Sequence, residues 1–156
     1  MSLFWLILVG FGAFLFMEFM AWFTHKYVMH GFLWVLHKDH HAPQRKVFER
    51  NDFFAVIFAV PSFLGIYLGL LNSQPVVLAL GIGIATYGVS YFLFHDILYH
   101  QRLKIFGDNM HWYFRSIVKA HFDHHRGKKN YGFLFMVPLR YIQDGYKQRK
   151  ETQSKS

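Results

Sequence analysis

The chain has 156 residues, of which 53% are hydrophobic and 21% aromatic, and it carries a formal net charge of +8 and no cysteine. Its length and apolar composition predict a single membrane-embedded domain, and the lack of cysteine excludes disulfides, thiolate nucleophiles, iron–sulfur clusters and cysteine-ligated zinc. Because Lys and Arg flank apolar stretches instead of forming one face of a soluble domain, the positive charge does not indicate a nucleic acid partner.

Three apolar stretches are long enough to cross a bilayer as helices. Residues 3–23 contain one charged residue, Glu18, and lack the basic segment and cleavage site of a signal peptide, so we expect a retained span. Residues 53–71 contain Pro61, which is expected to kink the helix. Residues 76–94 are rich in small side chains, including Gly81, Gly83 and Gly88, which would let a neighbouring helix approach closely.

Two regions after the first span need separate interpretation. Residues 31–52 form a polar connection between the first two spans, and Pro43 should stop any helix within it. Residues 133–141 are apolar but about half as long as a span, and they are predicted to lie on the membrane surface or to form a short or re-entrant fourth segment.

The distribution of Lys and Arg predicts the orientation of the chain. All of them lie between Lys26 and Arg50 or from Arg102 onward, whereas the N-terminus and residues 72–75 have none. The positive-inside rule therefore places the N-terminus outside the cell and the basic segments in the cytoplasm. The predicted fold is an all-α integral protein of the inner membrane with three long helices and a cytoplasmic helical cap. Residues 1–146 would form one domain and residues 147–156 a solvated or disordered tail.

Ten of the eleven histidines fall in four short boxes with a repeated spacing. An H-x4-H box is followed by an H-x2-H-H box in each half of the chain. On a regular helix, which turns about 100° per residue, the second kind of box would place three imidazoles on one face. The i, i+5 pair of the first kind either spans two metal ions or lies on a local π-bulge. The ten are His25, His30, His37, His40, His41, His95, His100, His121, His124 and His125.

This clustering predicts a metal centre, because neutral imidazole is the commonest protein metal ligand. A structural zinc site closes with four ligands and a catalytic one with about three, so ten histidines suit two metal ions of higher coordination, such as iron. Since two spans separate the two halves, all four boxes would meet on the same side of the membrane. A centre at that end of a helix bundle is suited to activate O2 against an apolar substrate from the lipid.

Other polar residues have competing interpretations. Glu18 lies inside the first span, where a carboxylate is a functional candidate by default, yet pairing with Tyr87 or Ser90 would be structural. Tyr87, Tyr91 and His95 share one helix face and could line a path to the metals.

Three aspartates and the eleventh histidine are also ambiguous. Asp96 adjoins a predicted ligand, and Asp39 and Asp123 either orient a histidine of another box or face solvent. His111 lies in a stretch, residues 109–120, with an amphipathic pattern, and a solvent-facing or interfacial position is favoured.

Along almost its whole length the chain resembles the bacterial β-carotene 3-hydroxylases, within the wider membrane fatty-acid hydroxylase and desaturase group. The histidine boxes identify the wider group, and the flanking residues narrow the resemblance to the carotenoid branch. The stretches that carry it are Met17-Glu-Phe-Met, His25-Lys-Tyr-Val-Met-His-Gly31, Asn51-Asp-Phe-Phe-Ala-Val and His95-Asp-Ile-Leu-Tyr-His-Gln-Arg102.

The resemblance implies a non-haem di-iron monooxygenase that uses O2 and electrons from reduced ferredoxin. It would hydroxylate C3 of the β-ionone ring, converting β-carotene to β-cryptoxanthin and zeaxanthin. Its metal ligands map onto the ten box histidines, and no role transfers to His111.

Two other functions compete with this one. The same centre could hydroxylate or desaturate a fatty acyl or sterol substrate. A metal transporter or non-catalytic metal-binding protein is disfavoured, because a transporter should carry polar ligands at mid-bilayer depth, where only Glu18 lies. The basic cytoplasmic surface suits membrane lipids and would also attract an acidic ferredoxin.

Overall fold

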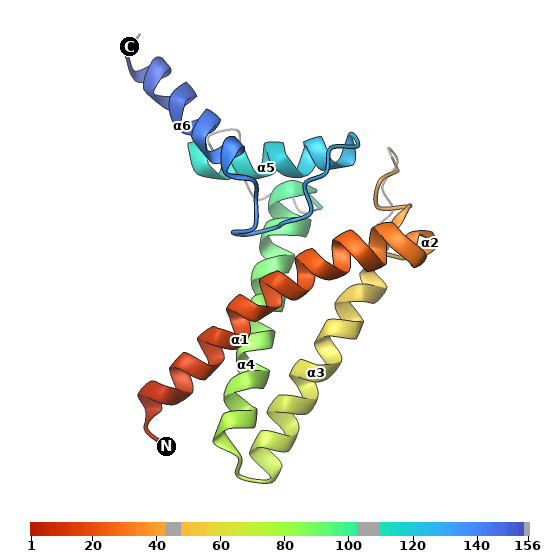
Figure 1. Cartoon of the computed structure of the whole chain (residues 1–156). Coiled ribbons are helices and arrows are strands. Elements are labelled where there is room, and N and C mark those ends of the chain that lie inside the picture. Colours follow the sequence, from red (N-terminus) through yellow and green to blue (C-terminus); the bar gives the residue numbers. More distant parts are fainter. Residues whose placement is uncertain (43–47, 103–109, 155–156) are drawn as a thin grey trace. The chain divides into compact units, whose positions relative to one another are not determined.

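The computed structural model describes residues 1–42, 48–102 and 110–154. No strand occurs within these ranges, which confirms the all-α prediction. The chain divides into two compact units, Met1–Ser90 and Tyr91–Ser156, and each is described by itself; the single-domain organisation stays a prediction. Figure 1 labels the α-helices, and in chain order the elements are α1 (Leu3–Phe23), the π-helix η1 (Thr24–Phe32), α2 (Trp34–His37), α3 (Asp52–Leu71), α4 (Pro75–Tyr91), the π-helix η2 (Phe92–Tyr99), α5 (Trp112–His125) and α6 (Leu139–Gln153).

Three helical runs in the described part of the chain are long and apolar enough to cross a membrane, as predicted: Leu3–Phe32, Asp52–Leu71 and Pro75–Tyr99. The first and third exceed the predicted spans because η1 continues α1 and η2 continues α4. Many apolar side chains on these helices point outward, such as Phe63, which is 66% exposed, and Leu70, which is 63% exposed. Lipid tails would cover such a surface, so the chain is a membrane protein.

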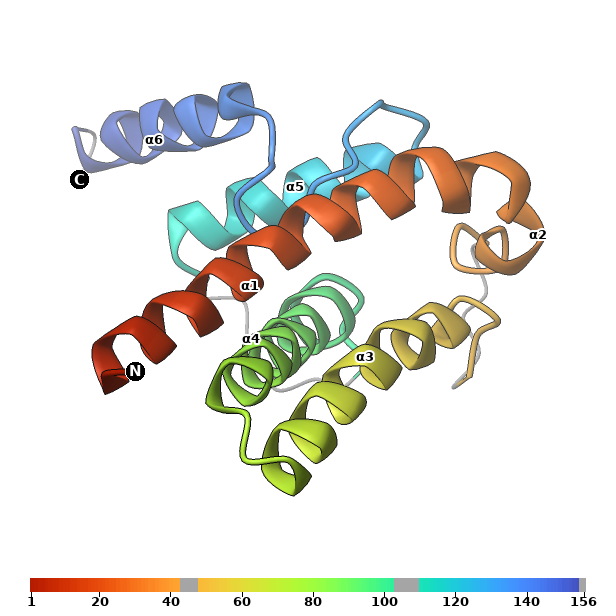
Figure 2. The same cartoon turned by 60° about the horizontal axis from the view of Figure 1, so that its bottom comes forward.

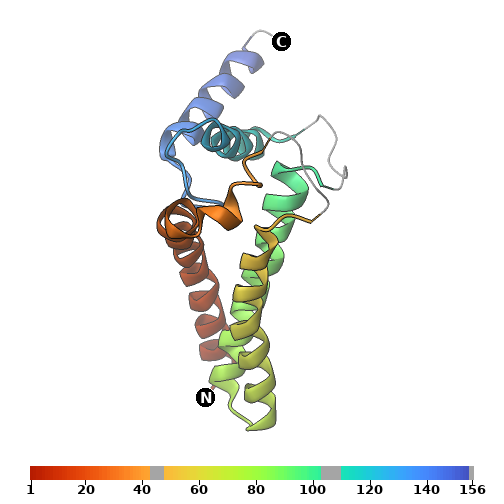
Figure 3. The same ribbon diagram turned by 90° about the vertical axis from the view of Figure 1, so that its right-hand side faces the viewer.

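Within the first unit, α1, α3 and α4 pack through small residues. Figure 3 shows α3 and α4 side by side and antiparallel, joined by a short turn. A methyl group added at Gly81 would lie 2.5 Å from the backbone N of Ile66 in α3, and one at Gly83 would lie 2.8 Å from Ala13 Cβ in α1. The predicted close approach is therefore confirmed at Gly81 and Gly83. Gly88 differs, because nothing lies within 4 Å of a Cβ added there.

The second unit has its own core where η2, α5 and the start of α6 meet. Leu98, Tyr99 and Ile117 are the buried residues of this cluster, with relative exposures of 6%, 1% and 1%. The Tyr99 hydroxyl donates to the Phe133 carbonyl at 2.8 Å, which attaches the segment before α6 to the same core.

The segment at residues 133–141 is a loop up to Pro138, where α6 begins with Leu139. Phe133 is buried, whereas Phe135 and Met136 are about half and over a third exposed, at 51% and 38%. No helix precedes Leu139 here, so the segment is not a fourth span; its position on the membrane surface stays a prediction.

Other expectations about the chain have different outcomes. The expected disorder of the tail is wrong for residues 147–153, because α6 continues to Gln153 with exposed side chains. Charged side chains spaced along a helix remain hydrated without preventing its backbone hydrogen bonds. Pro61 lies inside α3, which is helical on both sides of it. Pro43, expected to end a helix, lies outside the described residues.

Candidate metal centre

The two i, i+5 histidine pairs lie on π-helices. His25 and His30 belong to η1, while His95 lies in η2 and His100 directly follows it. A π-helix bonds residue i to residue i+5, so their side chains return to the same side of the helix. The His100 amide donates to the His95 carbonyl at 3.1 Å in this manner. The ring centroids of the two pairs are 5.0 Å and 4.6 Å apart. The sequence left two alternatives for these pairs, a span across two metal ions or a π-bulge, and both pairs lie on π-helices.

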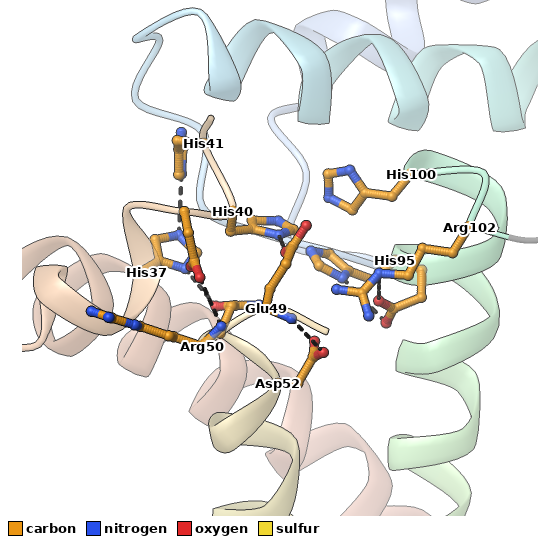
Figure 4. Close-up of polar contacts among 12 residues, drawn as sticks. His37, His40, His41, Glu49, Arg50, Asp52, His95, His100 and Arg102 are labelled. Carbon is orange, nitrogen blue, oxygen red and sulfur yellow. Dashed lines mark hydrogen bonds and ion pairs between the residues drawn. The ribbon is translucent and has the colours of Figure 1, made fainter. Parts of the chain in front are cut away.

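Four histidines of the first unit converge, and we call them the N-terminal histidine group: His25, His30, His37 and His41. Each offers a ring nitrogen within 4.8 Å of the others. The Nε2 atoms of His37 and His41 are 3.1 Å apart. Figure 4 shows this pair, with His37 at the end of α2. The first half of the chain thus forms one candidate metal-binding cluster.

Four histidines of the second unit form the C-terminal histidine group: His95, His100, His121 and His125. Ring nitrogens of His95, His100 and His121 lie within 4.8 Å of one another. The Nε2 of His121 is 2.8 Å from that of His100 and 3.0 Å from that of His125. The second half therefore repeats the arrangement of the first, with η2 and α5 supplying the ligands.

The middle histidine of each H-x2-H-H box has a polar contact of its own within its unit. His40 is directed to Glu49, and His124 Nδ1 is 3.3 Å from the Lys128 carbonyl. The expectation that all three imidazoles of a box share one helical face is wrong for the H-x2-H-H box of the first unit, because the helix ends too early. α2 already ends at His37, so His40 and His41 lie on a turn. In the box of the second unit the expectation holds, because α5 is helical through His125 and positions i, i+3 and i+4 lie within about 100° of one another.

Two residues that sequence reasoning missed contact the histidines from the segment before α3. His37 Nδ1 is 2.6 Å from Asn51 Oδ1. His40 Nδ1 is 2.7 Å from Glu49 Oε2, and Figure 4 labels both residues. Since these oxygens only accept, each Nδ1 carries the proton and each Nε2 keeps its lone pair for a metal. A hint in the sequence was Glu49, an acidic residue between the basic residues Lys46 and Arg50.

Burial keeps the His37 imidazole in the form that binds metals. His37 is 2% exposed, and this burial is the largest cause that lowers its pKa to about 2. Neighbouring His40, His41 and His30 lower its pKa further, while the hydrogen bond with Asn51 raises it. His37 is therefore neutral at physiological pH, as metal ligation requires.

The geometry of both groups fits a bound cation. Ring nitrogens 2.8 to 3.1 Å apart can share only one proton per pair, and the described residues include one such pair in the N-terminal group and two in the C-terminal group. Lone pairs directed at the same space repel one another unless a proton or a metal ion lies between them. All-imidazole donors suit iron, zinc, copper or nickel more than magnesium or calcium. The histidine clusters therefore fit a metal site.

Glu18 has a structural partner across the first unit. The Tyr87 hydroxyl of α4 donates to Glu18 Oε2 of α1 at 2.8 Å, and the two side chains are 3% and 1% exposed. Ser90, the alternative partner, donates to the Thr86 carbonyl. Tyr87 is thus used to hold Glu18, and its part in a substrate path stays a prediction.

Tyr91 and Asp96 both lie beside His95. The Tyr91 ring stacks on the His95 ring with centroids 4.7 Å apart. Asp96 Oδ2 is 3.5 Å from His95 Nδ1, a long contact, and Arg102 Nε donates to Asp96 Oδ1 at 2.9 Å. These contacts place both residues next to a predicted ligand, where they limit the rotation of its ring.

The remaining aspartates have backbone and side-chain partners. Asp39 accepts from the Arg50 amide at 2.8 Å. Asp123 accepts from Lys128 Nζ at 2.7 Å and from the Tyr141 hydroxyl at 2.9 Å, and these two hydrogen bonds hold its pKa below the usual value. Asp123 therefore joins α5 to α6 rather than contacting a histidine directly.

His111 is exposed and precedes α5 as its N-cap residue. Its Nδ1 accepts from the Tyr113 amide at 3.4 Å, which is a weak capping contact. This agrees with the solvent-facing position favoured from the sequence.

Comparison with known proteins gives the following similarities. A family model described as fatty acid hydroxylase matches residues 10–140. A β-carotene hydroxylase of Pantoea ananas is 39% identical over 150 residues, covering 93% of this chain and 85% of that protein. One of Pseudescherichia vulneris is 40% identical over 124 residues, 76% of this chain and 70% of that protein. A chloroplastic β-carotene 3-hydroxylase 2 of Arabidopsis thaliana is 36% identical over 146 residues, 90% of this chain but 48% of that longer protein. No solved structure matches the chain.

Proposed function

Because the chain belongs to the fatty acid hydroxylase family and is similar over most of its length to bacterial β-carotene hydroxylases, we propose that it hydroxylates the ring of a carotenoid. The substrate would be β-carotene, oxidised at C3 of its β-ionone rings to β-cryptoxanthin and zeaxanthin. The single observation that carries the proposal is the pair of buried histidine groups in a chain with three membrane-spanning helices.

The proposed metal ligands are the ten box histidines, and the proposed metal is iron, two ions per chain. When bound, iron supplies the activation of O2 that a C–H bond of a hydrocarbon ring requires. Burial keeps His37 neutral, and Asn51 and Glu49 orient His37 and His40. The Tyr91 ring, stacked on His95, limits the rotation of that imidazole.

The balance of the reaction requires an electron donor. One oxygen atom of O2 enters the C–H bond and the other leaves as water, which takes two electrons and two protons from outside the substrate. We propose reduced ferredoxin as the donor, approaching from the cytoplasm. The basic segments after residues 25 and 101 support this choice, because an acidic carrier is attracted to them.

The carotenoid substrate suits a centre reached from the membrane. A long hydrocarbon such as a carotenoid dissolves in the bilayer. The exposed side chains of α1, α3 and α4 are largely apolar, so lipid can cover them. We place the protein in the inner membrane with the N-terminus outside and the histidine boxes in the cytoplasm, on the basis of the Lys and Arg distribution.

Expression in bacteria that accumulate β-carotene tests this function. We expect pigment extracts to contain β-cryptoxanthin and zeaxanthin, whereas cells that make the His37→Ala variant at the same level should retain β-carotene. Unchanged carotenoids together with altered membrane fatty acids or sterols would instead assign the chain to the fatty acyl or sterol alternative.

A further inference from the structure

A groove between α5 and α6 lies within the second unit and is lined by residues other than the proposed metal ligands. Figure 2 shows the two helices next to each other. The groove has a volume of about 500 Å³, which is within the range of about 300–1,000 Å³ usual for small-ligand sites. Side chains from both helices line it, including Trp112, Arg115, Lys119, Asp144, Gln148 and Arg149.

The charges along the groove favour an anion. Arg115 and Lys119 are one turn apart on α5, and Arg149 lines the opposite side from α6. Against these three cations, the described lining has one carboxylate, that of Asp144. Arg115 Nε donates to the Met110 carbonyl at 2.8 Å, which holds this guanidinium close to α5.

The helices contact each other at the base of the groove through small residues. A methyl group added at Gly145 would collide with Ser116 Oγ and lie 3.6 Å from the Trp112 ring. Trp112 Nε1 is buried and has no acceptor among the residues that the structure describes. An indole N–H can only donate, so Trp112 adds a donor that an anion could satisfy.

The groove also lies near the end of a membrane span. Ile117, adjacent to Ser116, packs against Leu98 and Tyr99, which end the apolar run Pro75–Tyr99. Trp112 and Tyr146 form an edge-to-face pair with centroids 5.7 Å apart beside the groove. Trp and Tyr are enriched where hydrocarbon meets headgroups, so the groove is positioned for a lipid at the membrane surface.

We infer that the α5–α6 groove binds the headgroup of an anionic phospholipid of the phosphatidylglycerol type. Arg115, Lys119 and Arg149 face the phosphate, and Asp144 accepts a hydrogen bond from a glycerol hydroxyl. The groove volume of about 500 Å³ suits a small headgroup. This binding is independent of the hydroxylation proposed above.

Lipid titration of the full chain tests this inference. The delipidated protein in detergent would be titrated with phosphatidylglycerol, phosphatidylcholine and phosphatidic acid, and bound lipids counted by native mass spectrometry. Lys119→Gln/Arg149→Gln removes two groove cations, while Lys129→Gln/Lys147→Gln removes two exposed cations outside the groove lining. Since each cation near an anionic lipid contributes about 1 kcal/mol, we expect the groove variant to bind phosphatidylglycerol roughly tenfold to thirtyfold more weakly and the control to match the wild type.

Several outcomes would overturn the inference. Equal weakening in both double variants would mean non-specific attraction to net charge. Equal binding of phosphatidic acid would contradict the role of Asp144, and displacement of the lipid by glycerol phosphate at similar concentration would indicate a site for a free anion. A groove variant with unchanged lipid binding but reduced binding of an acidic redox protein would assign the groove to a protein partner. Helical content measured by circular dichroism checks that both variants fold.

Discussion

The proton position on His37 and on His40 depends on single residues outside the boxes. Glu49 accepts a hydrogen bond from Nδ1 of His40, and Asn51 accepts one from Nδ1 of His37. The lone pair of each Nε2 then remains for a metal. Because the histidines are buried, a lost acceptor cannot be replaced by bulk water. The metal affinity of a box therefore depends on residues that do not themselves bind the metal.

We expect Glu49→Leu to lower metal affinity by about tenfold to a hundredfold, as is usual when a hydrogen-bond partner of a ligating histidine is lost. Glu49→Gln should retain more metal than Glu49→Leu, since an amide oxygen can accept the same hydrogen. Arg50→Gln is the matched control, because the Arg50 contact to Asp39 uses its backbone amide. Metal content after dialysis against a chelator measures the effect. Equal retention in Glu49→Leu and wild type would show that the contact does not matter.

The histidines themselves should divide into ligands and a helix cap. His40→Ala and His124→Ala each remove one proposed ligand from a different half of the chain and should abolish hydroxylation in a protein that still inserts. His111→Ala should keep most of its activity, because its role is a weak N-cap of α5 worth about 1 kcal/mol or less. Pigment analysis at matched protein levels tests all three. Retained activity in either box variant would contradict the ten-ligand assignment.

At the scale of helices, glycine positions decide how closely the spans approach. Gly81 and Gly83 face α3 and α1, respectively, while Gly88 of the same helix faces open space. In a membrane, helices attract mainly through such close packing and a few hydrogen bonds, because lipid tails are as apolar as the side chains. The Ser62 hydroxyl, which donates to the Gly81 carbonyl at 3.0 Å, adds one of these hydrogen bonds.

A matched pair of substitutions in α4 tests this packing. Gly83→Ala should destabilise the first unit by about 1–3 kcal/mol through overpacking against Gly10 and Ala13. Gly88→Ala should be neutral or slightly stabilising, because alanine favours a helix by up to about 1 kcal/mol over glycine. The two variants make the same chemical change, and thermal unfolding in detergent compares them. A lower melting temperature for Gly88→Ala than for Gly83→Ala would refute the packing account.

At the scale of the whole molecule, the number of spans and the charge of the connections determine the expected orientation. Three spans give opposite sides to the two termini, and two spans separate the first histidine boxes from the later ones. Reporter fusions should therefore report a periplasmic turn at residues 72–75 and a cytoplasmic C-terminus. A cytoplasmic turn would reverse the proposed orientation and remove the argument for a cytoplasmic electron donor.

Metal content is the second whole-molecule property. If all ten box histidines ligate, purified protein should contain about two iron ions per chain and no stoichiometric zinc, because a zinc site closes with about four ligands. Elemental analysis and iron spectroscopy measure this. One tightly held zinc per chain would contradict the di-iron proposal while leaving the histidine clusters as a metal site.

The sequence by itself determined the spans, the helical class and the clustering of the histidines into boxes. These properties are written in local patterns: the length of an apolar run, the positions of charges and the spacing of identical residues. Residues 3–23 match α1 for this reason, and the i, i+5 spacing already suggested a π-helix.

Only the tertiary structure decided which of these groups meet. His40 and His41 lie on a turn and not on a helical face, because α2 ends at His37. Tyr87 rather than Ser90 holds Glu18, and Glu49 and Asn51 hold two histidines, because helix packing brings together residues far apart in the chain. No spacing along the sequence encodes such contacts, since they depend on the rotation and depth of each helix against its neighbours.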